Sequence, residues 1–138
     1  MSAFQIRGID HVVLRCINVD EMLRFYCDVL GCTIAKRNER LGLIHLSAGT
    51  AMIDLVSANG EIGYAGGSAV GLEARNMDHF CLRIEPFDID RLTEHLKAHG
   101  LAPAELRTRF GAEGDGLSFY LKDPAGNRVE LKGAPVSA

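Results

Sequence analysis

The sequence contains an internal repeat. The segment Ile9–Arg15 (Ile-Asp-His-Val-Val-Leu-Arg) recurs in the second half of the chain as Met77–Arg83 (Met-Asp-His-Phe-Cys-Leu-Arg). Each copy leads into a helical pattern and then into strand patterns, and each half closes with a glycine followed by a strand that carries one acid. Because self-similarity of this kind marks duplicated supersecondary units, the repeat predicts two similar modules in one chain.

The repeat includes polar residues that a duplicated core does not need. His11 and Asp54 in the first half correspond to His79 and Glu130 in the second. Imidazole and carboxylate groups are common ligands of divalent metal ions. Two half-sites of this kind would supply two imidazoles and two carboxylates to one cation.

Both acids lie between aliphatic residues in strand patterns. Alternate side chains of a strand share a face, so Asp54 lies on the opposite face from Ile53 and Leu55, and Glu130 is placed in the same way. A buried carboxylate is costly unless it is paired or bound to a metal. For each acid, the alternative is a salt bridge or a strand face exposed to solvent. The assignment of Asp54 is also less secure, because the alignment of the two repeats needs an insertion to match Asp54 with Glu130.

Composition narrows the class of protein. The chain has 138 residues, which fits one domain, and a net charge of −3, which argues against nucleic acid or an anionic membrane as a partner. No apolar run approaches the ~18 residues of a membrane span, and the first residues lack a signal sequence, so a cytoplasmic location is expected. The four cysteines are expected to form no disulfides, with Cys16 and Cys81 as buried free thiols in strands.

Hydrophobic periodicity predicts the same order of elements in both halves. The first module spans residues 8–57, with a helix that Asn18 or Asp20 caps and Gly31 ends, and the expected strands are 8–16, 33–37, 42–47 and 51–57. The second module spans residues 77–133, with a helix that Asp88 caps and Gly100 ends, and the expected strands are 78–85, 102–107, 117–122 and 127–132. Residues 58–76 are the expected linker. The fold class is α+β, with two βαβββ modules.

A glycine-rich segment precedes the last pair of strands. Arg107 and Arg109 lead into residues 110–116, which contain three glycines in a short stretch. Such a segment predicts a flexible loop, which could be a lid over an anionic substrate or a surface excursion.

Three motifs resemble the vicinal oxygen chelate superfamily: the Asp-His pair in both first strands, the segment Arg24–Gly31, and the segment Tyr120–Leu131. That superfamily includes glyoxalase I, extradiol dioxygenases, methylmalonyl-CoA epimerase, fosfomycin-modifying enzymes and bleomycin-resistance proteins. The resemblance covers about residues 8–133. It implies that the two modules form a curved mixed sheet with a cleft, where a divalent metal binds and substrate oxygens complete the coordination.

The resemblance to glyoxalase I implies a full set of ligands. It places His11, Asp54, His79 and Glu130 around the metal, with Asp54 standing where those enzymes have a Glu. It further implies that Glu130, ahead of Asp54, acts as the general base. Arg15 has the spacing of the arginine that engages glutathione, although the same residue type recurs in the second half and is equally well explained as a feature of the repeat.

Other members of the superfamily match in part. Fosfomycin-modifying enzymes match at Ser118 and Tyr120, but this chain departs from them at Val13 and offers only Lys132 beyond the last acid. Extradiol dioxygenases require two histidines and one glutamate on Fe(II), which the chain supplies, and Asp54 is the residue that argues against them. Bleomycin-binding relatives need no metal, but they usually lack the set of ligand residues found here.

Each of the remaining candidate site residues has a structural explanation as well as a functional one. His45 could be a substrate ligand or general base, but its place in the middle of a strand favours a hydrogen-bonded structural role. Tyr120 shares the strand face of Ser118, so both could contact substrate, and packing explains Tyr120 nearly as well. His95 and His99 are spaced i, i+4 on a helix, yet their polar neighbours favour a solvated face.

The sequence therefore predicts a metal-dependent enzyme that acts on a small oxygenated substrate, with a lyase or isomerase of glyoxalase I type as the main hypothesis. The metal would be Ni, Zn, Co, Mn or Fe(II). The alternatives are an Fe(II) dioxygenase and a metal-free protein that binds a drug or an aromatic ligand. A homodimer is expected, whether the modules meet within one chain or across two.

Overall fold

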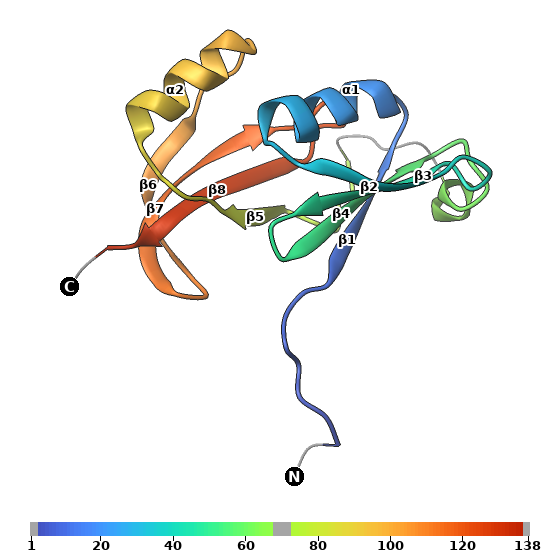
Figure 1. Ribbon diagram of the computed structural model, residues 1–138, viewed down its shortest axis with the longest axis horizontal. Coiled ribbons are helices and arrows are strands. Elements are labelled where there is room, and N and C mark those ends of the chain that lie inside the picture. The colour runs from blue at the N-terminus through green and yellow to red at the C-terminus, as the bar shows by residue number, and fades with distance from the viewer. Residues whose placement is uncertain (1–2, 68–72, 137–138) are drawn as a thin grey trace. The chain divides into compact units, whose positions relative to one another are not determined.

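The computed structural model describes residues 3–67 and 73–136 (Figure 1). The chain divides into two compact units, residues 1–70 and 71–138. Residues 68–72 of the predicted linker lie outside the described residues. In the described part of the chain, no helix is long and apolar enough to cross a membrane.

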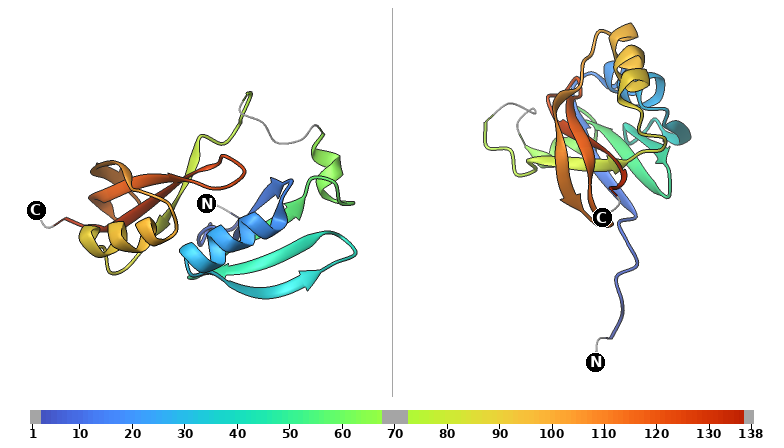
Figure 2. Two further views of the ribbon diagram at one scale, coloured as in Figure 1. Left: turned by 90° about the horizontal axis from the view of Figure 1, so that it is seen from above. Right: turned by 90° about the vertical axis from the view of Figure 1, so that its left-hand side faces the viewer.

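The first unit contains one sheet and one helical segment. Its elements are β1 (His11–Cys16), α1 (Val19–Leu23), the π-helical turn η1 (Arg24–Val29), β2 (Thr33–Asn38), β3 (Leu43–Ala48), β4 (Ala51–Ser57) and the 3-10 helix η2 (Gly63–Gly66). The strand order is β1-β4-β3-β2, with β1 parallel to β4 and the other neighbours antiparallel. The helical segment lies along one face of this sheet (Figure 2).

The second unit has the same topology. Its elements are β5 (His79–Arg83), α2 (Ile89–Ala98), β6 (Ala104–Gly111), β7 (Gly114–Lys122) and β8 (Arg128–Pro135). The strand order is β5-β8-β7-β6, with β5 parallel to β8. The predicted α+β class with two βαβββ modules is confirmed, and each module has its own four-stranded mixed sheet.

The helix ends lie where the sequence predicts them. Asn18, rather than Asp20, caps α1, because its side chain accepts a hydrogen bond from the main-chain N–H of Glu21. Asp88 caps α2 by accepting from the N–H groups of Asp90 and Arg91. A cap of this kind satisfies N–H groups that the first helical turn leaves unpaired.

Each sheet has an apolar face that forms the core of its module. In the first module, Leu46, Ile53 and Leu55 are almost fully buried, as is Tyr26 from η1. In the second module, the buried residues are Leu96 of α2 and, on β7 and β8, Phe119, Leu121, Val129 and Leu131. Because side chains alternate along a strand, Asp54 and Glu130 each lie on the other face of their own sheet, away from this apolar core.

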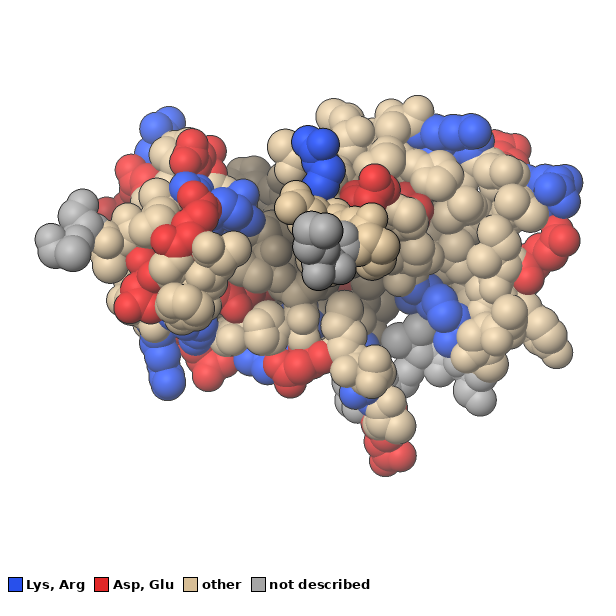
Figure 3. Space-filling view, turned by 90° about the horizontal axis from the view of Figure 1, so that it is seen from below, with Lys and Arg blue, Asp and Glu red and all other residues tan. Residues whose placement is uncertain are grey.

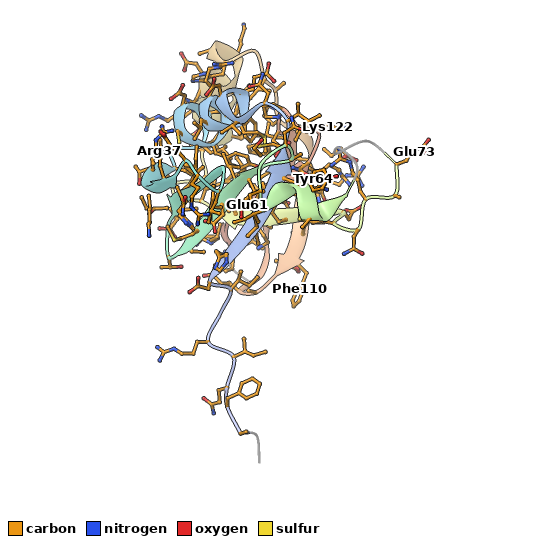
Figure 4. The ribbon with its side chains drawn as sticks, turned by 90° about the vertical axis from the view of Figure 1, so that its right-hand side faces the viewer. Arg37, Glu61, Tyr64, Glu73, Phe110 and Lys122 are labelled. Carbon is orange, nitrogen blue, oxygen red and sulfur yellow. The ribbon has the colours of Figure 1, made fainter. Side chains whose placement is uncertain are left out.

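The prediction of a flexible loop over residues 110–116 is wrong. The segment is the turn of a regular hairpin between β6 and β7, in which Gly111 pairs with Gly114. A Cβ atom at Gly111 or Gly116 would lie within 3.0 Å of the Lys132 side chain. These two glycines therefore allow close packing, which the sequence pattern does not distinguish from flexibility. Phe110 projects from the hairpin and is 83% exposed (Figure 4).

The prediction that Cys81 is buried is also wrong, whereas Cys16 is fully buried as expected. Cys81 pairs in register with Glu130 and is exposed. It therefore lies on the polar face of its sheet. The apolar pattern of the strand does not reveal which of the two faces Cys81 occupies. All four cysteines are free thiols.

Candidate functional site

The first module brings His11 and Asp54 together. They come from the parallel strands β1 and β4, where Val13 pairs with Asp54. His11 Nε2 lies 4.0 Å from Asp54 Oδ2, and the Asp54 side chain is 6% exposed while that of His11 is half exposed. A nearly buried carboxylate thus faces an imidazole nitrogen.

The second module repeats this arrangement with a closer contact. His79 Nε2 lies 3.1 Å from Glu130 Oε1, and the Glu130 side chain is nearly buried. Glutamate has one methylene more than aspartate, which is consistent with the shorter separation. The two modules therefore present equivalent pairs of nitrogen and oxygen donors.

An aspartate fixes each histidine ring. His11 Nδ1 lies 2.7 Å from Asp10 Oδ1, and His79 Nδ1 lies 2.7 Å from Asp78 Oδ2. A carboxylate can only accept, so an Nδ1 that carries a proton donates it to the aspartate, while Nε2 is turned toward the acid, as in the carboxylate–histidine pairs that support metal ligands. Sequence reasoning missed this role, although the Asp-His pair was visible in both copies of the repeat.

The same contacts shift two pKa values. The hydrogen bond to Asp10 raises the pKa of His11 above its usual value of 6.5. The hydrogen bond to His79 lowers the pKa of Asp78 below its usual value of 3.8. Each pairing thus favours the charged form of the group it shifts.

His45 joins the first half-site. It stands opposite Asp54 in the β3–β4 register, and its Nδ1 lies 2.9 Å from Asp54 Oδ1. One oxygen of Asp54 therefore faces His45 and the other faces His11. In the second module the equivalent position opposite Glu130 holds Tyr120.

Tyr120 lies between two guanidinium groups. The Cζ atoms of Arg109 and Arg128 lie 4.4 and 4.2 Å from the centre of its ring, and its ring meets the edge of His79 at 5.3 Å between ring centres. Arg109 also donates to the main-chain oxygen and the hydroxyl of Ser118. Ser118 and Tyr120 thus lie in a cationic environment, and the role of Arg128 was not predicted from sequence.

Arg15 holds the segment that follows β4. Its guanidinium donates to the carbonyl oxygens of Gly63, Gly66 and Gly67 at 3.0, 3.0 and 2.8 Å. Arg83, the matching residue of the second module, donates to two carboxylates, Glu113 among them, and to one main-chain oxygen. These contacts favour the interpretation of Arg15 as a structural feature of the repeat over that of a substrate ligand.

The donors fit a divalent cation. Each module offers an imidazole Nε2 and a carboxylate that is almost fully buried, and a buried carboxylate favours a cationic partner. Within residues 3–67 and 73–136, no three His, Cys, Asp or Glu side chains are grouped so that they could hold a metal ion. Each module by itself therefore offers one matched imidazole–carboxylate pair, and the first module adds a second imidazole, His45, that contacts Asp54.

The surface carries mixed charge. On the face shown in Figure 3, Lys and Arg side chains of the described residues lie among Asp and Glu side chains. This distribution agrees with the net charge of −3.

The sequence matches the glyoxalase/bleomycin resistance protein/dioxygenase superfamily over residues 8–131, and the chain belongs to that superfamily. It is 30% identical over 127 residues to the glyoxalase domain-containing protein RDO1 of Mycosarcoma maydis, covering 91% of this chain and 68% of that protein.

Solved structures show the same fold. An integron cassette protein from V. cholerae is 25% identical, with a TM-score of 0.74 over 96% of this chain and 98% of that chain. A virulence protein from Salmonella typhimurium is 26% identical, with a TM-score of 0.71 over 95% of this chain and 99% of that chain. Lactoylglutathione lyase from Agrobacterium tumefaciens is 23% identical, with a TM-score of 0.66 over 93% and 94% of the two chains, and this likeness concerns the fold alone.

Proposed function

We propose that this protein is a divalent-metal-dependent enzyme that acts on a small oxygenated substrate, as a lyase or isomerase of glyoxalase I type. The observation that carries the proposal is the matched pair of half-sites, in which a histidine held by an aspartate faces a buried acid. Membership of the superfamily and the likeness to a glyoxalase domain-containing protein support it.

His11, His79 and Glu130 would bind the metal, with Asp54 as the fourth ligand. A bound Ni, Co, Zn or Mn ion would supply Lewis-acid polarisation of a substrate carbonyl. Asp10 and Asp78 would hold the two imidazole rings in the tautomer that leaves Nε2 free to coordinate. His45 would orient Asp54 through their hydrogen bond.

Glu130 would move the proton. In this reaction its carboxylate accepts the proton from the hydroxyl-bearing C–H next to the substrate carbonyl and delivers it to the former carbonyl carbon. The hydroxyl proton moves to the former carbonyl oxygen, so that the net change is an isomerisation without an external oxidant. The near-complete burial of its side chain keeps bulk water from competing for that proton. Tyr120, which pairs with Glu130 in the sheet, and Ser118 would contact the substrate on this side.

The test uses protein with a measured metal content and an adduct of a 2-oxoaldehyde with a thiol as substrate. The metal-loaded protein should isomerise this adduct, and metal removal should abolish the reaction. When the reaction runs in deuterium oxide, most of the product should keep the hydrogen of the substrate C–H, because Glu130 is shielded from bulk water. Glu130→Gln should lower kcat by about 100-fold to 10,000-fold. Glu94→Gln, on α2, is the matched control and should have wild-type activity. Fully metal-loaded protein that is inactive with every thiol adduct would argue against the lyase or isomerase.

A second candidate function is an Fe(II) dioxygenase. Asp54 accepts a hydrogen bond from His45 and lies farther from its histidine than Glu130 does from His79, which favours a site with three protein ligands. Oxygen uptake with a catechol by Fe(II)-loaded protein would support this function. Binding of an aromatic ligand by protein that binds no metal would instead support a drug-binding protein.

We further propose a homodimer in which half-sites meet. Because each module supplies one histidine and one acid, a complete site needs two modules. Mixing inactive His11→Ala and His79→Ala chains should restore activity if the site is shared between subunits. An inactive mixture with proven subunit exchange would place the site within one chain, and sedimentation as a monomer would exclude the dimer.

A further inference from the structure

Arg128 takes part in the contacts that hold His79. The two residues stand opposite each other in the β5–β8 register. Arg128 Nη1 lies 3.3 Å from Asp78 Oδ2, and the same oxygen lies 2.7 Å from His79 Nδ1. One carboxylate oxygen thus accepts a hydrogen bond from the guanidinium and faces the imidazole, so the guanidinium resists any rotation of Asp78 away from the ring.

Arg128 is itself held in place. Its Cζ atom lies 4.2 Å from the centre of the Tyr120 ring, and its Nη2 lies 3.6 Å from Glu105 Oε2. The Tyr120 ring also packs against the His79 ring, at 5.3 Å between ring centres. Because a planar guanidinium that is stacked and paired in this way is pre-organised, it loses little further side-chain freedom when it holds Asp78.

The first module lacks this support. Met52 stands opposite His11 in the β1–β4 register, at the place that Arg128 occupies in the second module. A thioether cannot donate a hydrogen bond to a carboxylate. Among the residues that the structure describes, no Lys or Arg side chain forms an ion pair with Asp10, whose side chain is 92% exposed. The contact of Asp10 with His11 is therefore an isolated one at the surface, and such contacts hold their partners only weakly.

From this difference we propose that Arg128 is a positioning residue of the second module. Through Asp78 it holds the His79 ring with Nε2 turned toward Glu130 before a metal ion binds, so that the second module is the pre-organised half-site. The proposal rests on the proposed function, because it takes His79 as a ligand of the metal in that site. Pre-organisation strengthens binding, since less ordering is left to occur when the metal arrives.

NMR of the imidazole nitrogens in metal-free protein tests the proposal, at a pH where both rings are neutral. The spectrum reports whether Nδ1 or Nε2 carries the proton. His79 should be almost entirely in the form with the proton on Nδ1, which donates to Asp78. His11 should be a mixture of the two forms, because the Asp10 side chain is more exposed than that of Asp78.

Arg128→Met gives the second module the residue that stands at this place in the first. His79 should then become a mixture of the two forms, as His11 is. Arg128→Gln is the second variant if Arg128→Met does not fold, and it should have the same effect. Arg91→Met, which removes an exposed arginine of α2, is the charge-matched control and should leave the spectrum of His79 unchanged.

A double-variant cycle tests whether Arg128 acts through Asp78. Zinc affinity is measured by calorimetry with metal-free protein. Arg128→Met should lower this affinity by about 2-fold to 5-fold, which is the range of a partly exposed ion pair. In an Asp78→Asn chain the same change should have no further effect on the affinity, because the charged partner of Arg128 is then absent.

Three results would overturn the proposal. The first is a wild-type His79 that is a mixture of both forms. The second is a His79 that keeps its single form in a folded Arg128 variant, since the arginine would then only pack against Tyr120. The third is a loss of zinc affinity from Arg128→Met that persists at full size in the Asp78→Asn chain, since Arg128 would then act by another route.

The two proposals can fail separately. If the metal-loaded protein isomerises thiol adducts but His79 is unaffected by Arg128→Met, only the positioning role of Arg128 is wrong. If His79 depends on Arg128 and the protein binds zinc but shows no metal-dependent activity, only the proposed reaction is wrong.

Discussion

The two modules share their topology and their histidine–acid pairs, yet they differ at the positions around those pairs. Opposite the acid, the first module has His45 and the second has Tyr120. Duplication has thus kept a pair of donors in each half while the surrounding residues diverged. We therefore expect metal binding to depend on both modules, and we expect polar recognition of the substrate to come mainly from the second module.

The largest expected effect comes from removing either histidine. His11→Ala and His79→Ala should each lower the affinity for Zn or Ni by about 100-fold or more, because a ligand of the metal is lost and water replaces it only weakly. Calorimetry with metal-free protein measures the affinity. His95→Ala, on α2, is the control and should bind metal like the wild type. A large loss of metal affinity in only one of the two variants would show that the modules are not equivalent in metal binding.

Replacing the acid of each module should show whether the two acids contribute equally to metal binding. Glu130→Ala should lower metal affinity about 100-fold and Asp54→Ala only about 10-fold, because Asp54 is shared with His45 and lies farther from its histidine. Metal content after dialysis measures both. Equal losses would show that Asp54 is as strong a ligand as Glu130, and no loss for Asp54→Ala would leave three protein ligands.

The aspartates beside the histidines should have a smaller effect. Asp10→Asn and Asp78→Asn should each lower metal affinity by about 10-fold, because the imidazole loses the partner that fixes its tautomer. The same change can be followed without metal. The folded-state pKa of His11 is raised, so its contribution to stability is fully present below pH 6.5 and is lost as the pH rises through the folded pKa.

NMR titration of metal-free protein measures this directly. Asp10→Asn should lower the pKa of His11 toward 6.5 and should remove the pH dependence of stability that the pair produces. The pKa of Asp78 is lowered, so its contribution is present above pH 3.8 and is lost as the pH falls through the folded pKa. A His11 pKa that is unchanged in Asp10→Asn would contradict the assigned cause.

The smallest expected effect concerns the surface ion pairs of the two modules. Glu113→Gln should lower the free energy of unfolding by about 0.2–1 kcal/mol, because its pair with the partly exposed Arg83 fixes a hairpin. Glu61→Gln should have almost no effect, since its pair with Arg40 is longer, at 3.4 Å, and more exposed. Urea unfolding measures both variants, and a reversed order would mean that the hairpin turn is not held by this pair.

The sequence predicted best those features in which a particular polar residue stands at a fixed place in a hydrophobic pattern. The repeat predicted both modules, and the caps Asn18 and Asp88 were recognisable because a side-chain acceptor stood just before an apolar helical pattern. The hairpin at residues 110–116 was not predicted, because glycines that make room for Lys132 have the same composition as a mobile loop. Packing of this kind depends on residues far apart in the chain.

The candidate site was predicted only in part for the same reason. His11 and His79 stood out by repetition, but the link of His45 to Asp54 depends on the β3–β4 register. The two arginines that enclose Tyr120 come from different strands, and no local pattern indicates that they meet. Register between strands, which is set by the whole sheet, decides which polar residues become neighbours.

The central claim is that the two half-sites serve one metal ion, and metal stoichiometry tests it most directly. Metal-free protein is titrated with Zn in a calorimeter, and the bound metal per chain is then determined by elemental analysis. The account predicts one ion per chain, and no tightly bound ion in either His11→Ala or His79→Ala. Two ions per chain, of which each variant loses only one, would show that the modules bind metal independently and would contradict it.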